Sequence, residues 1–182
     1  AAYLLPPIIE RLRRTATGLT VDLIAKNSAA DLRRREADIA IRNFRPDQPE
    51  LIARKIKDVS ARLYVSEVYL ERFAKPLSVE TVAEADFISL WSPDTYLAAL
   101  AGAGLPIDRG NLTILADSHL VHWELLKAGL GIGMVPEFLG ENTPGIVRAL
   151  EGAYTPFQFP IWLTTHRELN TSRRVRMVFD FL

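Results

Sequence analysis

The sequence of 182 residues contains no cysteine. Without cysteine there is no disulfide framework, no thiolate metal site and no cysteine nucleophile. The chain also lacks a surplus of charge of either sign, because 22 Lys and Arg residues balance 22 Asp and Glu residues. Proteins that bind nucleic acid usually carry an excess of Lys and Arg, which neutralise the phosphate charges. This segment, which has no such excess, is therefore a poor candidate for binding nucleic acid.

Long hydrophobic runs are missing as well. No apolar stretch approaches the roughly 20 residues that a membrane-spanning helix needs, so we expect no membrane partner. Hydrophobic residues nevertheless make up 48% of the chain and charged residues 24%, the balance of an ordinary globular protein and not of a disordered one. The length predicts one large domain or two small ones.

Both ends of the sequence look internal. The chain starts at Ala1 without an initiator Met and enters a helical pattern directly at Pro6 and Pro7. Its last residues, 175–182, are still amphipathic. We therefore expect a piece of a longer polypeptide.

Short apolar strands alternate with helices along the chain. A strand at 20–25, a short helix at 31–36 and a strand at 37–41 follow one another with short joints, which favours a parallel sheet. The other expected elements are helices at 6–18, 68–74, 93–100, 119–128 and from Ser172 to the end, an extended stretch at 51–65, and strands at 87–91, 111–116 and 160–165. Ser66 is expected to cap the helix at 68–74, and Ser172 the last helix.

A polar residue stands between strand and helix at three places: Asn27-Ser28, Ser92 and Asp117-Ser118. Such residues cap helix N-termini, and in open α/β sheets these N-termini line a crevice at the strand ends. Their free amide groups favour anions. The pattern predicts a pocket for a small anionic or polar ligand.

Charge is unevenly distributed despite the neutral total. Residues 1–62 and 164–182 together hold 17 basic and 10 acidic side chains, whereas residues 63–163 hold 5 basic and 12 acidic ones. A shift of this size indicates two lobes, with the outer lobe built from both ends of the chain.

Several motifs, taken in order, resemble the effector-binding domain of LysR-type transcriptional regulators. They are LLPP at 4–7, DLRRREADIAIR at 31–42, LYVS at 63–66 followed by Tyr69-Leu70, KAGLGIGMVP at 127–136, and HREL at 166–169 with SRRVR at 172–176. Each motif is weak by itself, but the ordered set covers nearly the whole chain.

The resemblance implies a periplasmic-binding-protein-like (type II) α/β fold. Two Rossmann-like lobes would be joined by two crossover strands, with the ligand in the cleft between them. The outer lobe (regulatory subdomain 1) would comprise 1–62 and 164–182, and the inner lobe (regulatory subdomain 2) 63–163. The family's N-terminal winged helix-turn-helix and linker helix are absent, as is the first strand of the outer lobe, which would precede Tyr3.

The resemblance also marks effector-contact positions. Ser28 with Asn27 matches one of them, and Asp117-Ser118-His119 matches another. A plain helix cap also explains Ser28, and of the two we favour the ligand contact. Arg42 ends a predicted strand, where it can neutralise an anionic effector or form an ordinary ion pair.

Apolar residues complete the predicted site. Met134 and Val135 are expected to form an apolar wall, and Tyr3 and Trp91 to stand at the mouth of the cleft. Core packing explains Trp91 as well.

Metal and cofactor sites are not expected. Asp117, His119 and His122 lie close in sequence, but the chain has only three His and no HExxH pattern. The glycines of 129–133 follow a helix and lead into Met134, whereas a dinucleotide-binding loop follows a strand and opens a helix. They are expected to end the helix and to let the backbone approach the cleft.

Catalysis is not expected either, because no Gly-x-Ser-x-Gly nucleophile motif is present. The basic runs 33–35 and 173–174 are interpreted as solvated helix faces.

The sequence therefore predicts the effector-sensing domain of a bacterial, cytoplasmic LysR-type regulator. It would bind a small polar or anionic metabolite and form a homodimer, or a tetramer in the full-length protein, and would reach DNA only through the missing N-terminal domain. The alternative is a periplasmic solute-binding protein of a transporter, and a small enzyme on the same scaffold is the third class.

Overall fold

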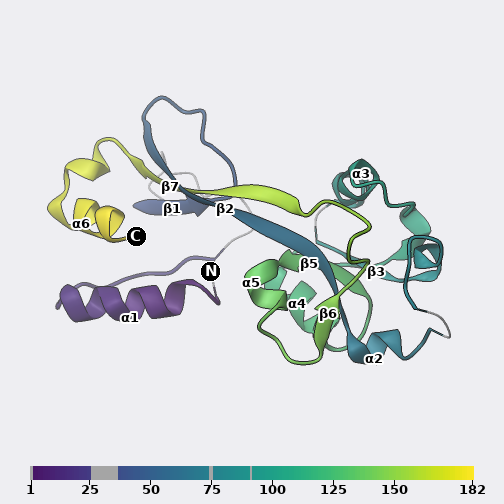
Figure 1. Ribbon diagram of the computed structural model, residues 1–182. Helices are drawn as coiled ribbons and strands as arrows, with labels where there is room; N and C mark the ends of the chain where they lie inside the picture. The colour runs from purple at the N-terminus through teal and green to yellow at the C-terminus, as the bar shows by residue number, and fades with distance from the viewer. Residues whose placement is uncertain (1, 26–36, 74–75, 91) are drawn as a thin grey trace. The chain divides into compact units, whose positions relative to one another are not determined.

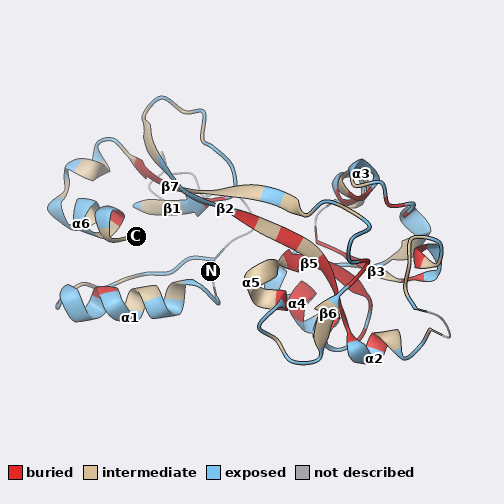
Figure 2. Ribbon diagram, in the orientation of Figure 1, coloured by how far each residue is buried: buried red, intermediate tan, exposed pale blue. Residues whose placement is uncertain are grey.

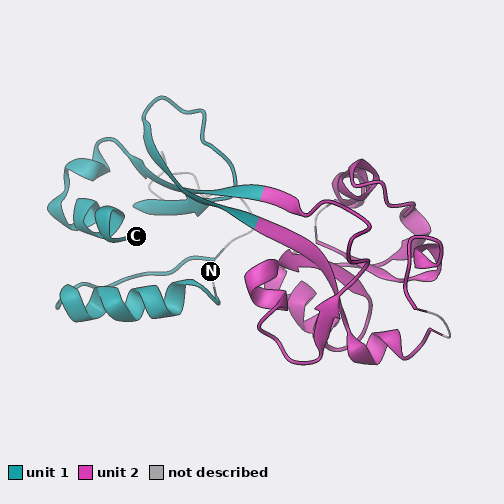
Figure 3. Ribbon diagram, in the orientation of Figure 1, with its two compact units in different colours: residues 1–59, 159–182 teal, residues 60–158 magenta. Residues whose placement is uncertain are grey.

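The computed structural model describes residues 2–25, 37–73, 76–90 and 92–182 (Figure 1). The chain forms two compact units (Figure 3): unit 1 comprises residues 1–59 and 159–182, and unit 2 comprises 60–158. The chain enters unit 2 along β2 (Leu51–Ser66) and returns along β7 (Phe157–His166), so that each of these strands belongs to both units.

In the described residues of unit 1, two helices and a short strand accompany its parts of β2 and β7. Helix α1 (Leu5–Thr15) carries prolines in its first turn, where their missing N–H groups cost nothing, and buries Leu12. Strand β1 (Ile39–Arg42) pairs antiparallel with β7. A short 3-10 turn, η3 (Leu169–Thr171), precedes helix α6 (Arg173–Phe181).

The strand predicted at 20–25 is wrong. Residues 19–25 belong to no strand, and Leu23 and Ile24 are exposed. Alternating apolar residues make a strand only where a neighbour supplies ladder hydrogen bonds, and β1 is paired with β7 instead. The parallel pair predicted for this region is therefore not formed, and the helix predicted at 31–36 lies outside the described residues.

Unit 2 holds the strand–helix–strand pattern that the sequence predicts. Strand β3 (Phe87–Ser89) pairs in parallel with β4 (Leu112–Leu115) and with β5 (Ile132–Pro136), whereas β2 pairs antiparallel with β5 and with β6 (Ile146–Arg148). The remaining elements are α2 (Glu67–Leu70), η1 (Val82–Glu84), α3 (Pro93–Gly102), η2 (Arg109–Asn111), α4 (His119–Lys127) and α5 (Glu137–Gly140).

Three of the predicted helix caps are confirmed. The hydroxyl oxygens of Ser66, Ser92 and Ser118 accept hydrogen bonds from backbone N–H groups of the helices that they begin. Ser172 occupies the N-cap position of α6, but its side chain makes no capping bond. Helix α2 ends at Leu70, earlier than predicted, and the sequence patterns missed α5 and β6 altogether.

The core of unit 2 lies between its strands and α4 (Figure 2). Fully burying one large apolar side chain stabilises a fold by roughly 1.5–3 kcal/mol. The buried cluster combines residues from β2, β3, β5 and α4 with Ala116, which follows β4: Tyr64, Ile88, Ala116, Trp123, Leu126 and Val135.

A buried histidine ties α4 to the sheet. His122 is 1% exposed, and its Nε2 lies 3.1 Å from the Ile88 carbonyl oxygen of β3. Burial lowers the pKa of His122 to about 4. The ring is therefore neutral near pH 7, and Nε2–H donates to the carbonyl, which can only accept.

Gly133 of β5 makes room for this ring. A Cβ at Gly133 would lie 2.7 Å from Cε1 and 2.8 Å from Nε2 of His122, and 2.9 Å from a methyl carbon of Leu126. The last glycine of the 129–133 run thus serves packing between β5 and α4. Gly129, whose φ is +75°, ends α4 as the sequence predicts.

The titration of His122 makes unit 2 sensitive to acid. Its folded-state pKa lies below the unfolded value of about 6.5, so its stabilising contribution is complete above pH 6.5 and is lost as the pH falls towards 4. We expect this residue to lower the free energy of unfolding by roughly 1.4 kcal/mol per pH unit in that window. Urea unfolding between pH 4 and 6.5 should show this loss of free energy of unfolding in the natural chain and not in His122→Gln. The same dependence of the free energy of unfolding on pH in both proteins would contradict the prediction.

Gly133→Ala should destabilise the protein by about 1–3 kcal/mol, because the new methyl group overpacks the His122 ring. In a double-mutant cycle with His122→Ala, the smaller neighbour should relieve part of this cost. Gly102→Ala is the matched control, since a Cβ there meets no atom within 4 Å. Equal destabilisation by both alanine variants would exclude the packing explanation.

Candidate ligand-binding site

The carboxyl ends of β3 and β4 lie at one edge of the sheet of unit 2. Ser89 is in register with Leu115, and the Ala116 N–H donates to the Ser89 carbonyl at 2.9 Å. From these ends the chain continues into α3 and α4, whose first residues therefore lie at the same edge. This is the edge at which open α/β sheets bind ligands.

The first turn of α4 presents the polar groups that the sequence predicts for the site. Ser118 is half-buried; its carbonyl accepts from the N–H of His122 at 2.8 Å, and its Oγ accepts from the N–H of Val121 at 3.4 Å. Because this Oγ acts as an acceptor towards the helix, its O–H remains able to donate to a ligand. Asp117 and His119 flank it and are exposed.

The start of α3 adds a second polar group. Ser92 is exposed, and its Oγ accepts from the N–H of Thr95 at 3.3 Å and lies 2.8 Å from the Thr95 hydroxyl. The free N–H groups in the first turns of two helices carry partial positive charge, which favours an anionic or polar ligand. The carboxylate of Asp117 opposes a second negative charge on the ligand and favours one that also carries a donor.

Met134 and Val135 lie in β5 and are almost completely buried. Val135 belongs to the apolar core beside Trp123 and Leu126. Its role as a wall of the ligand site stays a prediction, as does that of Met134. The sequence analysis considered His122 as a metal ligand, but its Nε2–H donates to the Ile88 carbonyl. Within the described ranges, no group of three His, Asp or Glu residues is arranged to hold a metal ion.

Unit 1 carries the other predicted site residues. Arg42 is buried at the end of β1, with its guanidinium carbon 5.6 Å from the ring centre of Phe44. Tyr3 is exposed, just before α1. Asn27, Ser28 and Trp91 lie outside the described residues, so their predicted contacts stay predictions.

The structure leaves three apolar residues near the start of α4 exposed, which the sequence patterns did not reveal. Leu115, at the end of edge strand β4, is 59% exposed, and Leu120 and Val121 on α4 are 48% and 52% exposed; these three residues are called the apolar patch below. The sequence signal for this exposure was weak: apolar residues stand on both sides of Ser118, but the same pattern fits a buried helix. None of the helices in the described part of the chain is long and apolar enough to cross a membrane.

Curated relatives carry the same kind of domain within longer chains. The HTH-type transcriptional regulator CrgA from Neisseria meningitidis serogroup C (strain 8013) is 24% identical over 185 residues, which cover 99% of this chain and 62% of CrgA. CrgA from the serogroup B strain MC58 matches with the same identity and coverage. The chain thus spans less than two thirds of the length of these relatives.

Solved structures agree on the fold. The regulatory domain of CrgA, a LysR-type transcriptional regulator from N. meningitidis, matches with a TM-score of 0.83 and 23% identity over 99% of this chain and 90% of that one. Full-length AphB, the Vibrio cholerae virulence activator, matches with a TM-score of 0.78 and 20% identity, over 99% of this chain and 63% of AphB. The AmpR effector binding domain from Citrobacter freundii matches with a TM-score of 0.75 and 15% identity, over 98% of this chain and 89% of that domain.

The whole chain, residues 1–182, matches the family model of the LysR substrate binding domain. This match and the mixed α/β architecture confirm the fold class that the sequence predicts, the periplasmic-binding-protein-like (type II) fold. The chain belongs to the LysR substrate-binding domain family.

Proposed function

We propose that this chain is the effector-sensing part of a LysR-type transcriptional regulator. It binds a small polar or anionic metabolite without chemical conversion, and a separate N-terminal domain of the full-length protein contacts DNA. The observation that carries this proposal is the family match over all 182 residues, together with relatives described as transcriptional regulators. A cytoplasmic location follows from a function on DNA.

The ligand site supports binding in preference to catalysis. Ser118 and Ser92 are helix caps whose oxygen atoms accept hydrogen bonds from the backbone, so neither is arranged as a nucleophile beside a base. The buried His122 is bound to a backbone carbonyl, and its proton is not available to a substrate. The family match also favours a regulator over a solute-binding protein of a transporter.

Binding would be read out as a shift between conformations. A ligand moves such an equilibrium only by its difference in affinity for the two states. We propose that the effector changes the angle between the lobes or the geometry of the dimer, and thereby the spacing of the DNA-binding domains.

Effector binding is tested by thermal unfolding against a panel of small carboxylates, phosphates and amino acids. A true effector at about 100 times its Kd should stabilise the protein by roughly 2.7 kcal/mol. With a hit in hand, we expect Ser28→Ala, Arg42→Ala and Ser118→Ala each to weaken binding about tenfold in calorimetric titrations, since each removes a hydrogen bond to the ligand.

Ser78→Ala is the matched control for the hydroxyl variants, because Ser78 lies in a turn before η1 and bonds to Glu80 and Thr81. Its affinity for the hit should equal that of the natural chain. Unchanged affinity in all three site variants would remove this assignment of the site.

We also propose that the chain forms a homodimer, with the tetramer as a state of the full-length regulator. Unit 1 holds 16 basic and 10 acidic residues, and unit 2 holds 6 basic and 12 acidic residues. If unit 1 of one copy meets unit 2 of the other, opposite charges face each other twice across the two-fold axis. The exposed patch of Leu115, Leu120 and Val121 supplies apolar area for such an interface.

Leu115→Glu should shift the protein from dimer to monomer in sedimentation velocity at micromolar concentration, because it places a charge in the apolar patch. Val68→Glu is the control: Val68 is 61% exposed on α2 and lies beside Gly129, at the C-terminal end of α4, whereas Leu120 and Val121 lie in its first turn. This variant should remain dimeric. A natural chain that sediments as a monomer would contradict the dimer itself.

A further inference from the structure

Strands β1 and β7 bring a tryptophan and two arginines together in unit 1. Arg42 is the register partner of Trp162, and directly opposed residues of an antiparallel pair project their side chains from the same face of the sheet. The guanidinium carbon of Arg45, three residues after β1, lies 5.6 Å from the centre of the Trp162 ring. One indole and two cationic side chains therefore gather on one face of the β1–β7 pair.

The indole N–H of Trp162 is a buried donor without an acceptor. Trp162 is half-buried as a whole, but its Nε1 is closed to solvent, and no group in the described part of the chain accepts a hydrogen bond from it. Nearly all buried N–H groups in proteins are paired, because an unpaired donor has lost water and gained nothing in return. An indole N–H can only donate, so what this position calls for is an acceptor.

The guanidinium of Arg45 is available as a second donor. Its contact with the Trp162 ring is a cation–π interaction, and among the described residues it makes neither an ion pair nor a hydrogen bond. Asp47, two residues further along the chain, is exposed and does not pair with it. All five N–H groups of this guanidinium thus remain able to donate to an acceptor from outside the chain.

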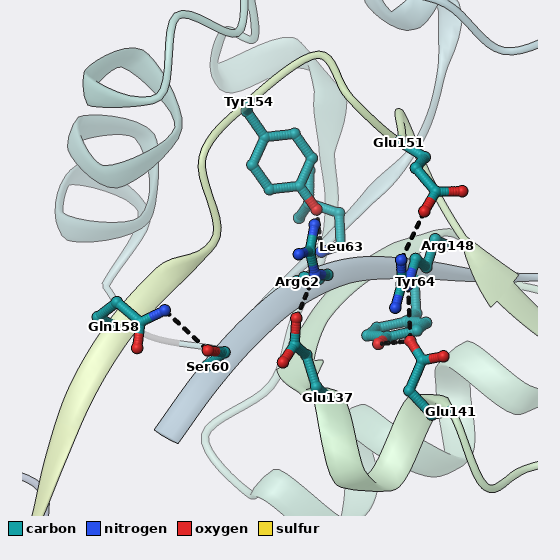
Figure 4. Close-up of polar contacts among 10 residues, drawn as sticks. All are labelled: Ser60, Arg62, Leu63, Tyr64, Glu137, Glu141, Arg148, Glu151, Tyr154 and Gln158. Carbon is teal, nitrogen blue, oxygen red and sulfur yellow. Dashed lines mark hydrogen bonds and ion pairs between the residues drawn. The ribbon is translucent and has the colours of Figure 1, made fainter. Parts of the chain in front are cut away.

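Two arginines of unit 2 show the partner that a guanidinium normally has in this chain. Arg62 forms an ion pair with Glu137, and Arg148 pairs with both Glu141 and Glu151 (Figure 4). Hydrogen bonds between a guanidinium and a carboxylate are among the strongest in proteins, because both groups are charged and planar. A carboxylate is therefore the group that fits a guanidinium left without an acid.

We propose that Trp162 and Arg45 bind a carboxylate anion from solution. One carboxylate oxygen accepts from the indole N–H, the other accepts from the Arg45 guanidinium, and Arg42 adds positive charge on the same face. The Arg45 side chain is exposed, so it can move aside to admit a small anion to the indole edge. This inference rests on the proposed function and deepens it, because it names a carboxylate as the effector group that unit 1 recognises.

NMR of the indole N–H groups tests this site on the whole chain. The sequence contains three tryptophans, and the signal of Trp162 is the one that Trp162→Phe removes. Titration of the natural chain with sodium acetate, at an ionic strength held constant with sodium chloride, should move this signal downfield until it saturates, because a carboxylate forms a charge-assisted hydrogen bond with the indole. Acetamide, which has a carbonyl acceptor but no charge, should move it much less.

The role of Arg45 is tested by a pair of charge-matched variants. Arg45→Gln should weaken acetate binding about tenfold in the same titration, because the charged donor is lost. Arg13→Gln is the control: it removes one positive charge from an exposed position of α1, also in unit 1, and should leave the titration of the Trp162 signal unchanged.

A Trp162 signal that does not move with acetate, or that moves equally with acetamide, would overturn the proposal. Equal weakening by Arg13→Gln and Arg45→Gln would overturn the role of Arg45. Saturation by inorganic phosphate at a lower concentration than by acetate would overturn the choice of a carboxylate. A hit in the thermal unfolding screen that leaves the Trp162 signal unmoved would reject this site and retain the proposed function.

Discussion

The arrangement of unit 2 depends on the parallel pairing of β3 with β4 on one side and β5 on the other. Parallel neighbours cannot be joined by a hairpin, so the chain returns each time through a helix, first α3 and then α4. Both helices consequently begin at the same edge of the sheet. Strand direction brings the polar groups proposed to bind the ligand, Ser92 and Ser118, to this edge, although they lie 26 positions apart in the sequence.

Packing then holds that edge in place. His122 joins α4 to β3 through a buried hydrogen bond, and Gly133 leaves the space that the ring requires. The cost of burying a polar ring is offset because its donor is satisfied and because the ring remains neutral. The first turn of α4 is thus supported from below by the core while its Ser118 hydroxyl and free amide groups stay accessible. This orientation before a ligand arrives is what the proposed reversible binding requires.

Strand β2 runs through both units. Its embedded segment, residues 61–66, takes part in the sheet of unit 2 and is held by Glu137, Tyr154 and Glu141. Its exposed segment, residues 54–58, carries three basic side chains, one acidic side chain and one apolar side chain.

Composition, motif order and local pattern by themselves determined the family, the fold class and most helices of unit 2. Ser66, Ser92 and Ser118 were predicted as caps because capping is a local interaction between a side chain and the next turn. The strand predicted at 20–25 was wrong because a strand needs a partner that no local pattern reveals. Only the tertiary structure decided that His122 packs against Gly133, that Leu115 stays exposed and that Arg62 and Tyr64 bind Glu137 and Glu141. These contacts join residues 11 to 77 positions apart, and long-range pairing is chosen by packing and burial of the whole chain, not by the preference of any one segment.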